Sequence, residues 1–121
     1  HPDVTVIEER PLLLEAAAPI ASLDALADAT PAQLDAVRST YLERLAAAHD
    51  GARPLVIDKF PLNLTAAPVI AALFPGAPII FVRRHPCDCV LSGFMQAFVQ
   101  NLGMASFLDI PAAADFSDAV M

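Results

Sequence analysis

The chain has 121 residues, of which 56% are hydrophobic, and its formal net charge is −7 at pH 7. This hydrophobic fraction excludes a disordered tail and is large enough for one compact core. The acidic balance excludes a general nucleic-acid-binding protein, because such proteins need a basic face. Any anion site must therefore be local and made by a few converging cations.

The longest uncharged stretch runs from Phe60 to Val82, a length that could cross a bilayer. Prolines and a glycine interrupt it, so we expect a buried helix, a turn and a buried strand, and no membrane partner. The N-terminus lacks the basic region and apolar run of a signal peptide. The Ala- and Pro-rich composition is compatible with a bacterial cytoplasmic protein.

Strand and helix patterns alternate along the chain. Two features mark helix ends: Pro31 suits the first helical position after Thr30, and Asp50-Gly51 suits a helix C-terminus. The predicted elements, in chain order, are a strand over 4–7, a helical region over 11–29 that Pro19 interrupts, a helix from 30 to 51, a strand over 54–58, a helix over 62–74, a strand over 79–83, a helix over 86–101 and a last helix from Pro111.

This order predicts an α/β fold with a parallel sheet flanked by helices in three layers. Strands joined by a helix run parallel with a right-handed crossover, so their carboxyl ends share one edge. Ligands of open α/β sheets bind at that edge. Glu9, Lys59 and Arg84 each follow or end a predicted strand. We therefore expect these three charged side chains to converge.

The segment from Ile79 to Ser92 has the pattern of a phosphate site. Four apolar β-formers lead into Arg83 and Arg84, and Pro86 then suits the first position of a helix. Helix N-termini offer unpaired N–H groups to anions, and arginine adds a planar fork of donors. Ser92 follows about two turns later. The alternative is an ordinary strand–helix junction with two solvated arginines.

Arg84-x-Pro86-x-Asp88, with Ser92 eight residues after the arginine, resembles the 3′-phosphate-binding segment of sulfotransferases. These enzymes use 3′-phosphoadenosine 5′-phosphosulfate (PAPS) as the sulfuryl donor. In that family the arginine and the serine hold the 3′-phosphate of the nucleotide. The resemblance implies this role for Arg84 and Ser92, with Arg83 as a further candidate.

Two upstream segments extend the resemblance. Residues 56–63 (Val-Ile-Asp-Lys-Phe-Pro-Leu-Asn) and 73–77 (Leu-Phe-Pro-Gly-Ala) are similar to segments of bacterial sulfotransferases often fused to tetratricopeptide repeats. Those enzymes in turn resemble tyrosylprotein sulfotransferases. The resemblance implies a P-loop-like domain that transfers a sulfuryl group from PAPS to a hydroxyl acceptor without a metal. Neither the acceptor nor the oligomeric state is indicated by these residues.

The first ten residues supply the candidate base. They are similar to the family segment that follows its 5′-phosphosulfate loop, in which a glutamate matching Glu9 is the proposed general base. Sulfuryl transfer needs such a group, because the attacking hydroxyl loses its proton. Glu8 is the second candidate. Lys59 would stabilise the departing nucleotide phosphate. The alternative for both charged sites is an ordinary solvated turn or strand end.

Two parts of the family pattern are absent from this chain. The 5′-phosphosulfate loop should lie just before His1, and a later strand should follow Met121. Residues 1–121 are therefore expected to be a partial sulfotransferase domain, truncated at both ends. No Gly-Lys-Ser/Thr phosphate loop occurs in the sequence.

Alternative functions remain open at this point. A nucleotide kinase of related architecture also transfers a group from a nucleotide, although the Arg-to-Ser spacing favours a sulfotransferase. A non-catalytic interaction module could have kept the fold without the donor loop. For Asp58 and Asn63, the alternative to a ligand role is capping the following helix. Cys87-x-Cys89 has no clustered histidine, so we expect buried thiols and no metal.

Overall fold

The computed structural model describes residues 1–49, 51–96 and 104–120. It divides into two compact units, His1–Pro78 and Ile79–Met121, which are described separately below. Within the described residues the chain is a mixed α/β protein with six α-helices and a two-strand parallel sheet.

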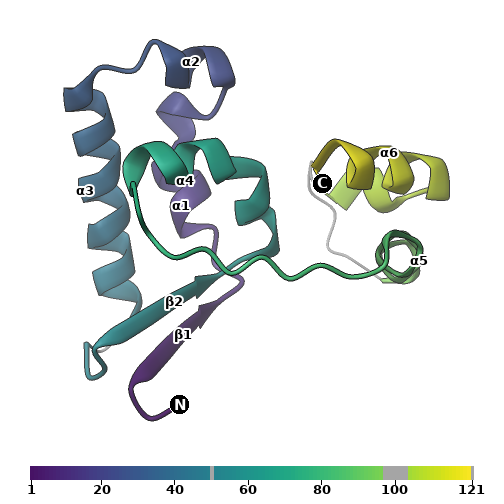
Figure 1. Ribbon diagram of the computed structural model, residues 1–121, viewed down its shortest axis with the longest axis horizontal. Helices are drawn as coiled ribbons and strands as arrows, with labels where there is room; N and C mark the ends of the chain where they lie inside the picture. Colours follow the sequence, from purple (N-terminus) through teal and green to yellow (C-terminus); the bar gives the residue numbers. More distant parts are fainter. Residues whose placement is uncertain (50, 97–103, 121) are drawn as a thin grey trace. The chain divides into compact units, whose positions relative to one another are not determined.

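The sheet of the first unit is formed by β1 (Val4–Glu8) and β2 (Leu55–Lys59), which lie side by side in Figure 1. They run parallel, in a register that starts with Val4 opposite Leu55 and ends with Glu8 opposite Lys59. Both strands are rich in β-branched residues, which favour this structure. The strands predicted over 4–7 and 54–58 are therefore confirmed.

The region after β1 forms three short helices: α1 (Leu12–Ala16), the 3₁₀-helix η1 (Ala18–Ile20) and α2 (Leu23–Ala27). Pro19 has no N–H and cannot continue α1, so the predicted interruption is found where the sequence places it. Ser22 then begins α2, and its hydroxyl accepts a hydrogen bond from the backbone N–H of Ala25 at 3.1 Å.

The longest helix, α3 (Pro31–Ala48), begins where the sequence predicts. Thr30 and Gln33 form a capping box. The Thr30 hydroxyl accepts from the Gln33 N–H at 3.3 Å, and the Gln33 side-chain oxygen accepts from the Thr30 N–H at 2.9 Å. After the helix, Gly51 adopts a φ of +68°, a left-handed conformation that glycine adopts at little cost.

After β2, the chain forms the 3₁₀-helix η2 (Pro61–Ala66) and α4 (Ala67–Leu73), so the helix predicted over 62–74 is present with a 3₁₀ first half. Arg38 of α3 donates through Nε to the carbonyl of Leu73 at 2.6 Å and ties the two helices together. In Figure 1 the helices of this unit lie to one side of the two strands. The core cluster consists of Leu13, Ala17, Ile20, Val37, Ala66, Val69 and Leu73.

The strand expected over 79–83 is wrong. These residues form no regular element, and the apolar side chains of the segment are exposed, up to 80% for Ile80. A strand with apolar residues on both faces needs a neighbouring strand and covering layers. Among the described residues β2 pairs only with β1, and the opposite face of the sheet leaves Val6, Leu55 and Ile57 exposed. The expected three-layer arrangement is therefore found only as a two-strand sheet with helices on one face.

The second unit contains α5 (Pro86–Met95), the 3₁₀-helix η3 (Met104–Phe107) and α6 (Ile110–Val120). Gly93 of α5 lies against the ring of Phe107, and an added Cβ would lie 2.5 Å from that ring. Of the helix predicted over 86–101, the structure shows the part to Met95, and 97–101 lie outside the described residues. The last helix begins at Ile110, one residue before the expected start.

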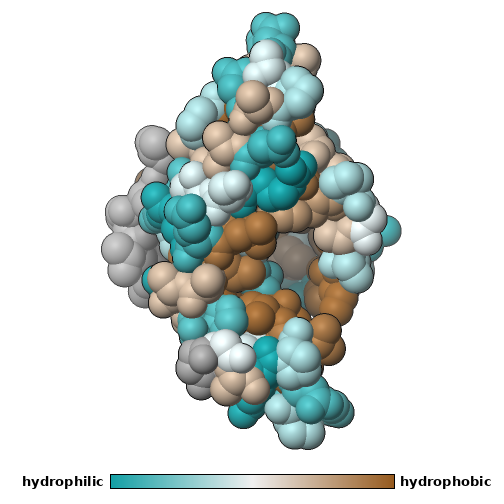
Figure 2. Space-filling view, turned by 90° about the vertical axis from the view of Figure 1, so that its left-hand side faces the viewer, coloured by the Kyte–Doolittle hydropathy of each residue, from teal (hydrophilic) through white to brown (hydrophobic). Residues whose placement is uncertain are grey.

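Hydrophobic side chains also reach the surface, as brown patches between hydrophilic residues in Figure 2. In the part of the chain that the structure describes, no helix is both long and apolar enough to cross a bilayer.

Candidate functional site

Glu9 and Lys59 meet at the carboxyl ends of the two strands. The Lys59 ammonium donates to Oε1 of Glu9 at 2.9 Å, and the Glu9 backbone N–H donates to the carbonyl of Lys59 at 2.8 Å. Parallel strands bring their carboxyl ends to one edge, which is why residues 50 apart in sequence become neighbours. The structure thus brings together two of the three charged residues that the sequence predicted to converge. Glu8, the second candidate base, is the last residue of β1.

Glu9 has an unusual backbone conformation. Its φ is +55°, the one positive value among the described non-glycine residues. A side chain in this left-handed region costs of order 1 kcal/mol. The turn is held by the backbone hydrogen bond from Glu9 to Lys59. Strain of this kind concentrates at functional sites, where the surrounding structure maintains it.

The Glu9–Lys59 ion pair is accessible to ligands. The side chain of Lys59 is 48% exposed and that of Glu9 is 66% exposed. The hydrogen bond that Lys59 donates to Glu9 raises the pKa of Lys59, desolvation opposes this, and the charges of Glu9 and Glu8 add to the rise. Lys59 therefore remains a full cation at neutral pH. An exposed pair of this kind is held weakly, so either group can exchange its partner for a ligand.

A second polar group lies on the other face of β2. Successive strand residues point to opposite faces, so Asp58 points toward the helices while Lys59 points away from them. The Tyr41 hydroxyl of α3 donates to Oδ2 of Asp58 at 3.1 Å. Burial raises the pKa of Tyr41, and the charge of Asp58 and their hydrogen bond raise it further.

Burial also raises the pKa of Asp58, and the hydrogen bond from Tyr41, followed by the nearby Asn63 amide, partly offsets the rise. Oδ1 of Asp58 has no hydrogen-bond partner of good geometry within the described residues. Oδ1 of Asn63 is likewise buried without a partner there. Neither residue caps a helix, since η2 begins with no side-chain cap, so that sequence alternative is wrong.

The Tyr41–Asp58 contact was not predicted from the sequence. The residues lie 17 positions apart on different elements, and Tyr41 falls on the apolar stripe of its helix. The structure places Asp58 on the inner face of β2 together with Val56, but the sequence does not mark that face, because residues 55–57 are apolar on both faces of the strand. A carboxylate there requires a donor from a packed helix.

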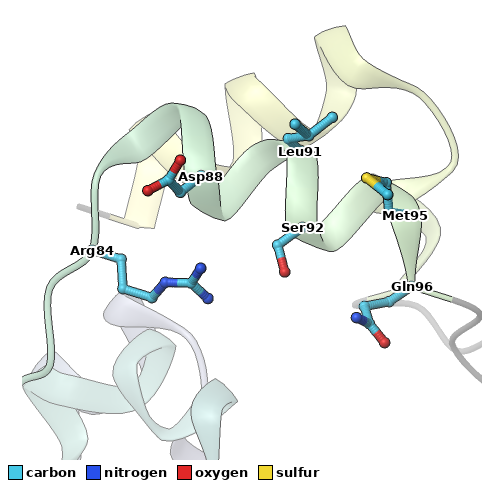
Figure 3. A pocket seen from close by; sticks show the side chains of 6 residues that line it. All are labelled: Arg84, Asp88, Leu91, Ser92, Met95 and Gln96. Atoms are coloured by element: carbon cyan, nitrogen blue, oxygen red, sulfur yellow. The ribbon is translucent and has the colours of Figure 1, made fainter.

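The second unit has a shallow pocket of about 270 Å³ at α5, lined by Arg84, Asp88, Leu91, Ser92, Met95 and Gln96. Figure 3 shows the Arg84 guanidinium and the Ser92 hydroxyl on the same side of the helix, directed into the same space. Arg84 precedes the helix and Ser92 lies within it. The eight-residue spacing noted in the sequence therefore places a cation and a hydroxyl in one pocket. Arg83 does not line it.

The start of α5 is capped by its own chain. Pro86 occupies the first turn, and Nδ1 of His85 accepts from the backbone N–H of Cys87 at 3.3 Å. Asp88 places a carboxylate in the first turn, where it suits the helix dipole. Cys87 and Cys89 are free thiols. The helix start predicted from Pro86 is thus confirmed.

Comparison with known proteins gives the family. The model described as "Sulfotransferase family" matches residues 5–120. A curated relative from Aquifex aeolicus (strain VF5), described as an uncharacterized protein, is 33% identical over 67 residues, which are 55% of this chain and 9% of that protein. The chain thus matches only a small part of this relative's length. No solved structure matches significantly. Because the family model covers nearly the whole chain, this chain belongs to the sulfotransferase family.

Proposed function

We propose that this protein transfers a sulfuryl group from PAPS to a hydroxyl group of an acceptor. Family membership supports a transferase with a donor and an acceptor substrate. The observation that carries the proposal is the contact between Glu9 and Lys59, which places a carboxylate and a cation 2.9 Å apart at the carboxyl edge of a parallel sheet. This edge is where α/β proteins bind their ligands.

Each of the two residues has a distinct role in the proposed reaction. The acceptor oxygen attacks sulfur while its proton moves to the Glu9 carboxylate. The bond between sulfur and the bridging oxygen of the nucleotide breaks, and that oxygen leaves with the electron pair. The Lys59 ammonium neutralises the charge that develops on the departing phosphate, more in the transition state than in the ground state.

The weakness of the Glu9–Lys59 ion pair supports these two separate roles. In the free protein Glu9 and Lys59 neutralise each other. A donor phosphate offers Lys59 a stronger anionic partner, and the exchange frees the Glu9 carboxylate to accept a proton. Because both side chains are exposed to solvent, breaking their contact costs little free energy. Donor binding would thus prepare the base for the acceptor.

The α5 pocket is the proposed site for the 3′-phosphate of the donor. Arg84 supplies a planar fork of donors suited to phosphate, and Ser92 supplies a hydroxyl in the same pocket. Arg83 does not line the pocket, but it adds positive charge directly before Arg84 in the sequence. The 5′-phosphosulfate contacts are not assigned to any residue of this chain.

A transfer assay with radiolabelled PAPS and a panel of alcohols and phenols tests the proposal. We expect labelled product with at least one acceptor, and a loss of about 100-fold or more in rate for Glu9→Gln and for Lys59→Ala. Glu15→Gln is the matched control, because Glu15 forms a similarly exposed ion pair with Arg44. Equal rates for Glu9→Gln and Glu15→Gln would contradict the assignment of the base.

A further inference from the structure

We propose that Tyr41 and Asp58 form a positioning pair that fixes the carboxyl end of β2 and thereby directs Lys59 toward Glu9. Tyr41 belongs to α3 and Asp58 to β2. The inference rests on the proposed function for its consequence in catalysis. Its structural claim can be tested without any activity.

Asp58 and Lys59 occupy the last two positions of β2. Asp58 and Lys59 are consecutive, so their side chains project from opposite faces of β2. Tyr41 contacts the inner side chain, and Glu9 contacts the outer one. Holding Asp58 therefore fixes the twist of the strand end and the direction in which Lys59 leaves it.

The ion pair between Lys59 and Glu9, on the outer face of β2, is weak. Lys59 and Glu9 are 48% and 66% exposed, and exposed ion pairs do not hold long side chains in one geometry on their own. The inner contact is better protected: Tyr41 is half-buried, and its ring packs edge-on against Phe74 with centroids 5.4 Å apart. The rigid side of the strand end is thus the side that carries Asp58.

The Asp58 carboxylate does not use all of its hydrogen-bonding capacity within the described residues. Oδ1 of Asp58 and Oδ1 of Asn63 are buried without partners among the described residues. Unpaired buried acceptors reduce stability, and an apolar residue at position 58 would avoid that cost. The carboxylate is therefore poorly explained by stability alone. A role in holding the strand end next to a functional lysine accounts for it.

A single-site spectroscopic probe is available, because Lys59 is the only lysine in the chain. Isotopically labelled lysine gives one side-chain NMR signal, and its titration reports the Lys59 pKa. That pKa is raised mainly by the hydrogen bond that Lys59 donates to Glu9. Loss of the Glu9 contact lowers it toward its ordinary value of 10.5.

Tyr41→Phe is the decisive variant, because it removes one hydroxyl, changes no charge at neutral pH and keeps the ring that packs on Phe74. We expect Tyr41→Phe to lower the Lys59 pKa, as Glu9→Gln does. Asp58→Ala should do the same, whereas Asp58→Asn, which keeps an acceptor for Tyr41, should preserve more of the shift. Thr40→Val is the control, since Thr40 is an exposed neighbour on α3.

An unchanged Lys59 pKa in folded Tyr41→Phe would overturn the proposal. Amide spectra establish whether each variant is folded. If Asp58→Ala does not fold, Tyr41→Phe alone tests the positioning role. In the transfer assay, Tyr41→Phe should lower kcat about tenfold and change the KM for PAPS less than it changes kcat, because small misplacements of a catalytic group are costly. If the wild-type chain transfers no sulfuryl group while the Lys59 pKa responds as expected, the proposed function fails and the positioning role of Tyr41 and Asp58 stands.

Discussion

Glu9 and Lys59 are joined twice, once through the backbone and once through their side chains. The backbone N–H of Glu9 donates to the carbonyl of Lys59 at 2.8 Å, and the Lys59 ammonium donates to the Glu9 carboxylate at 2.9 Å. The first bond fixes the two strand ends relative to each other. The second can open when an anionic ligand competes for Lys59. A fixed backbone with an exchangeable side-chain pair suits a site that must bind a phosphate and release a base.

The first prediction concerns the left-handed backbone of Glu9. At a φ of +55° an alanine keeps the steric cost, whereas a glycine does not. Glu9→Gly should therefore be more stable than Glu9→Ala by about 1 kcal/mol in urea unfolding, although both variants lose the carboxylate. Equal stabilities of the two variants would show that the turn carries no strain.

The second prediction is a pH dependence of stability caused by Asp58. Its folded-state pKa is raised above its ordinary value of 3.8, so just above pH 3.8 the folded state binds more protons than the unfolded state. Stability contributed by this group is full below 3.8 and is lost as pH rises through the folded-state pKa.

The free energy of unfolding should therefore fall as pH rises through the folded-state pKa of Asp58. Asp58→Asn should remove this fall. Urea unfolding across the window above the unfolded-state pKa measures the effect. Asp118→Asn, an exposed substitution on α6, removes the same charge without the burial and should leave the fall intact. A wild-type stability that rises across this window, with the same slope in both variants, would contradict the assignment.

The third prediction uses Tyr41, the only tyrosine of the chain. Burial and the neighbouring carboxylate raise its pKa, so the ultraviolet signal of tyrosinate should appear well above its ordinary value of 10.0. Asp58→Asn should lower the Tyr41 pKa part of the way, because the burial remains. A Tyr41 that titrates at its ordinary value in the folded wild type would show that the contact with Asp58 does not form in solution.

The fourth prediction concerns Ser92 in the α5 pocket. A hydroxyl that bonds a phosphate contributes about 1 kcal/mol or somewhat more, so Ser92→Ala should weaken binding of adenosine 3′,5′-bisphosphate about 3- to 10-fold. Ser39→Ala, at an exposed position of α3, is the matched control and should bind as the wild type does. Equal affinities of the two variants would remove Ser92 from the proposed site.

Features set by local chemistry were predictable from the sequence. The start of α3 follows from Thr30 and Pro31, and the start of α5 follows from Pro86, because capping and the fixed φ of proline act within a few residues. The meeting of Glu9 and Lys59 was predictable for a different reason. It needs only that the two strands run parallel, since their carboxyl ends then share an edge.

Features set by distant partners were not predictable in the same way. The run from Ile79 to Val82 has strong β-propensity, yet a strand also requires a neighbour that supplies hydrogen bonds, and the sequence does not reveal whether one is present. The Tyr41–Asp58 bond depends on how α3 packs on β2. The positive φ of Glu9 had no signal, because glutamate has no preference for that conformation.

The most direct test of the sulfotransferase assignment is calorimetric titration of the chain with adenosine 3′,5′-bisphosphate, with 5′-AMP and the Arg84→Ala variant in parallel. We predict that the bisphosphate binds more tightly than 5′-AMP, and that Arg84→Ala weakens its binding about 10- to 100-fold, since charge-assisted hydrogen bonds contribute about 1.5–3 kcal/mol. Arg44→Ala, which removes an exposed arginine of the first unit, should have no effect. Equal binding of both nucleotides by the folded chain, unaffected by Arg84→Ala, would contradict the account.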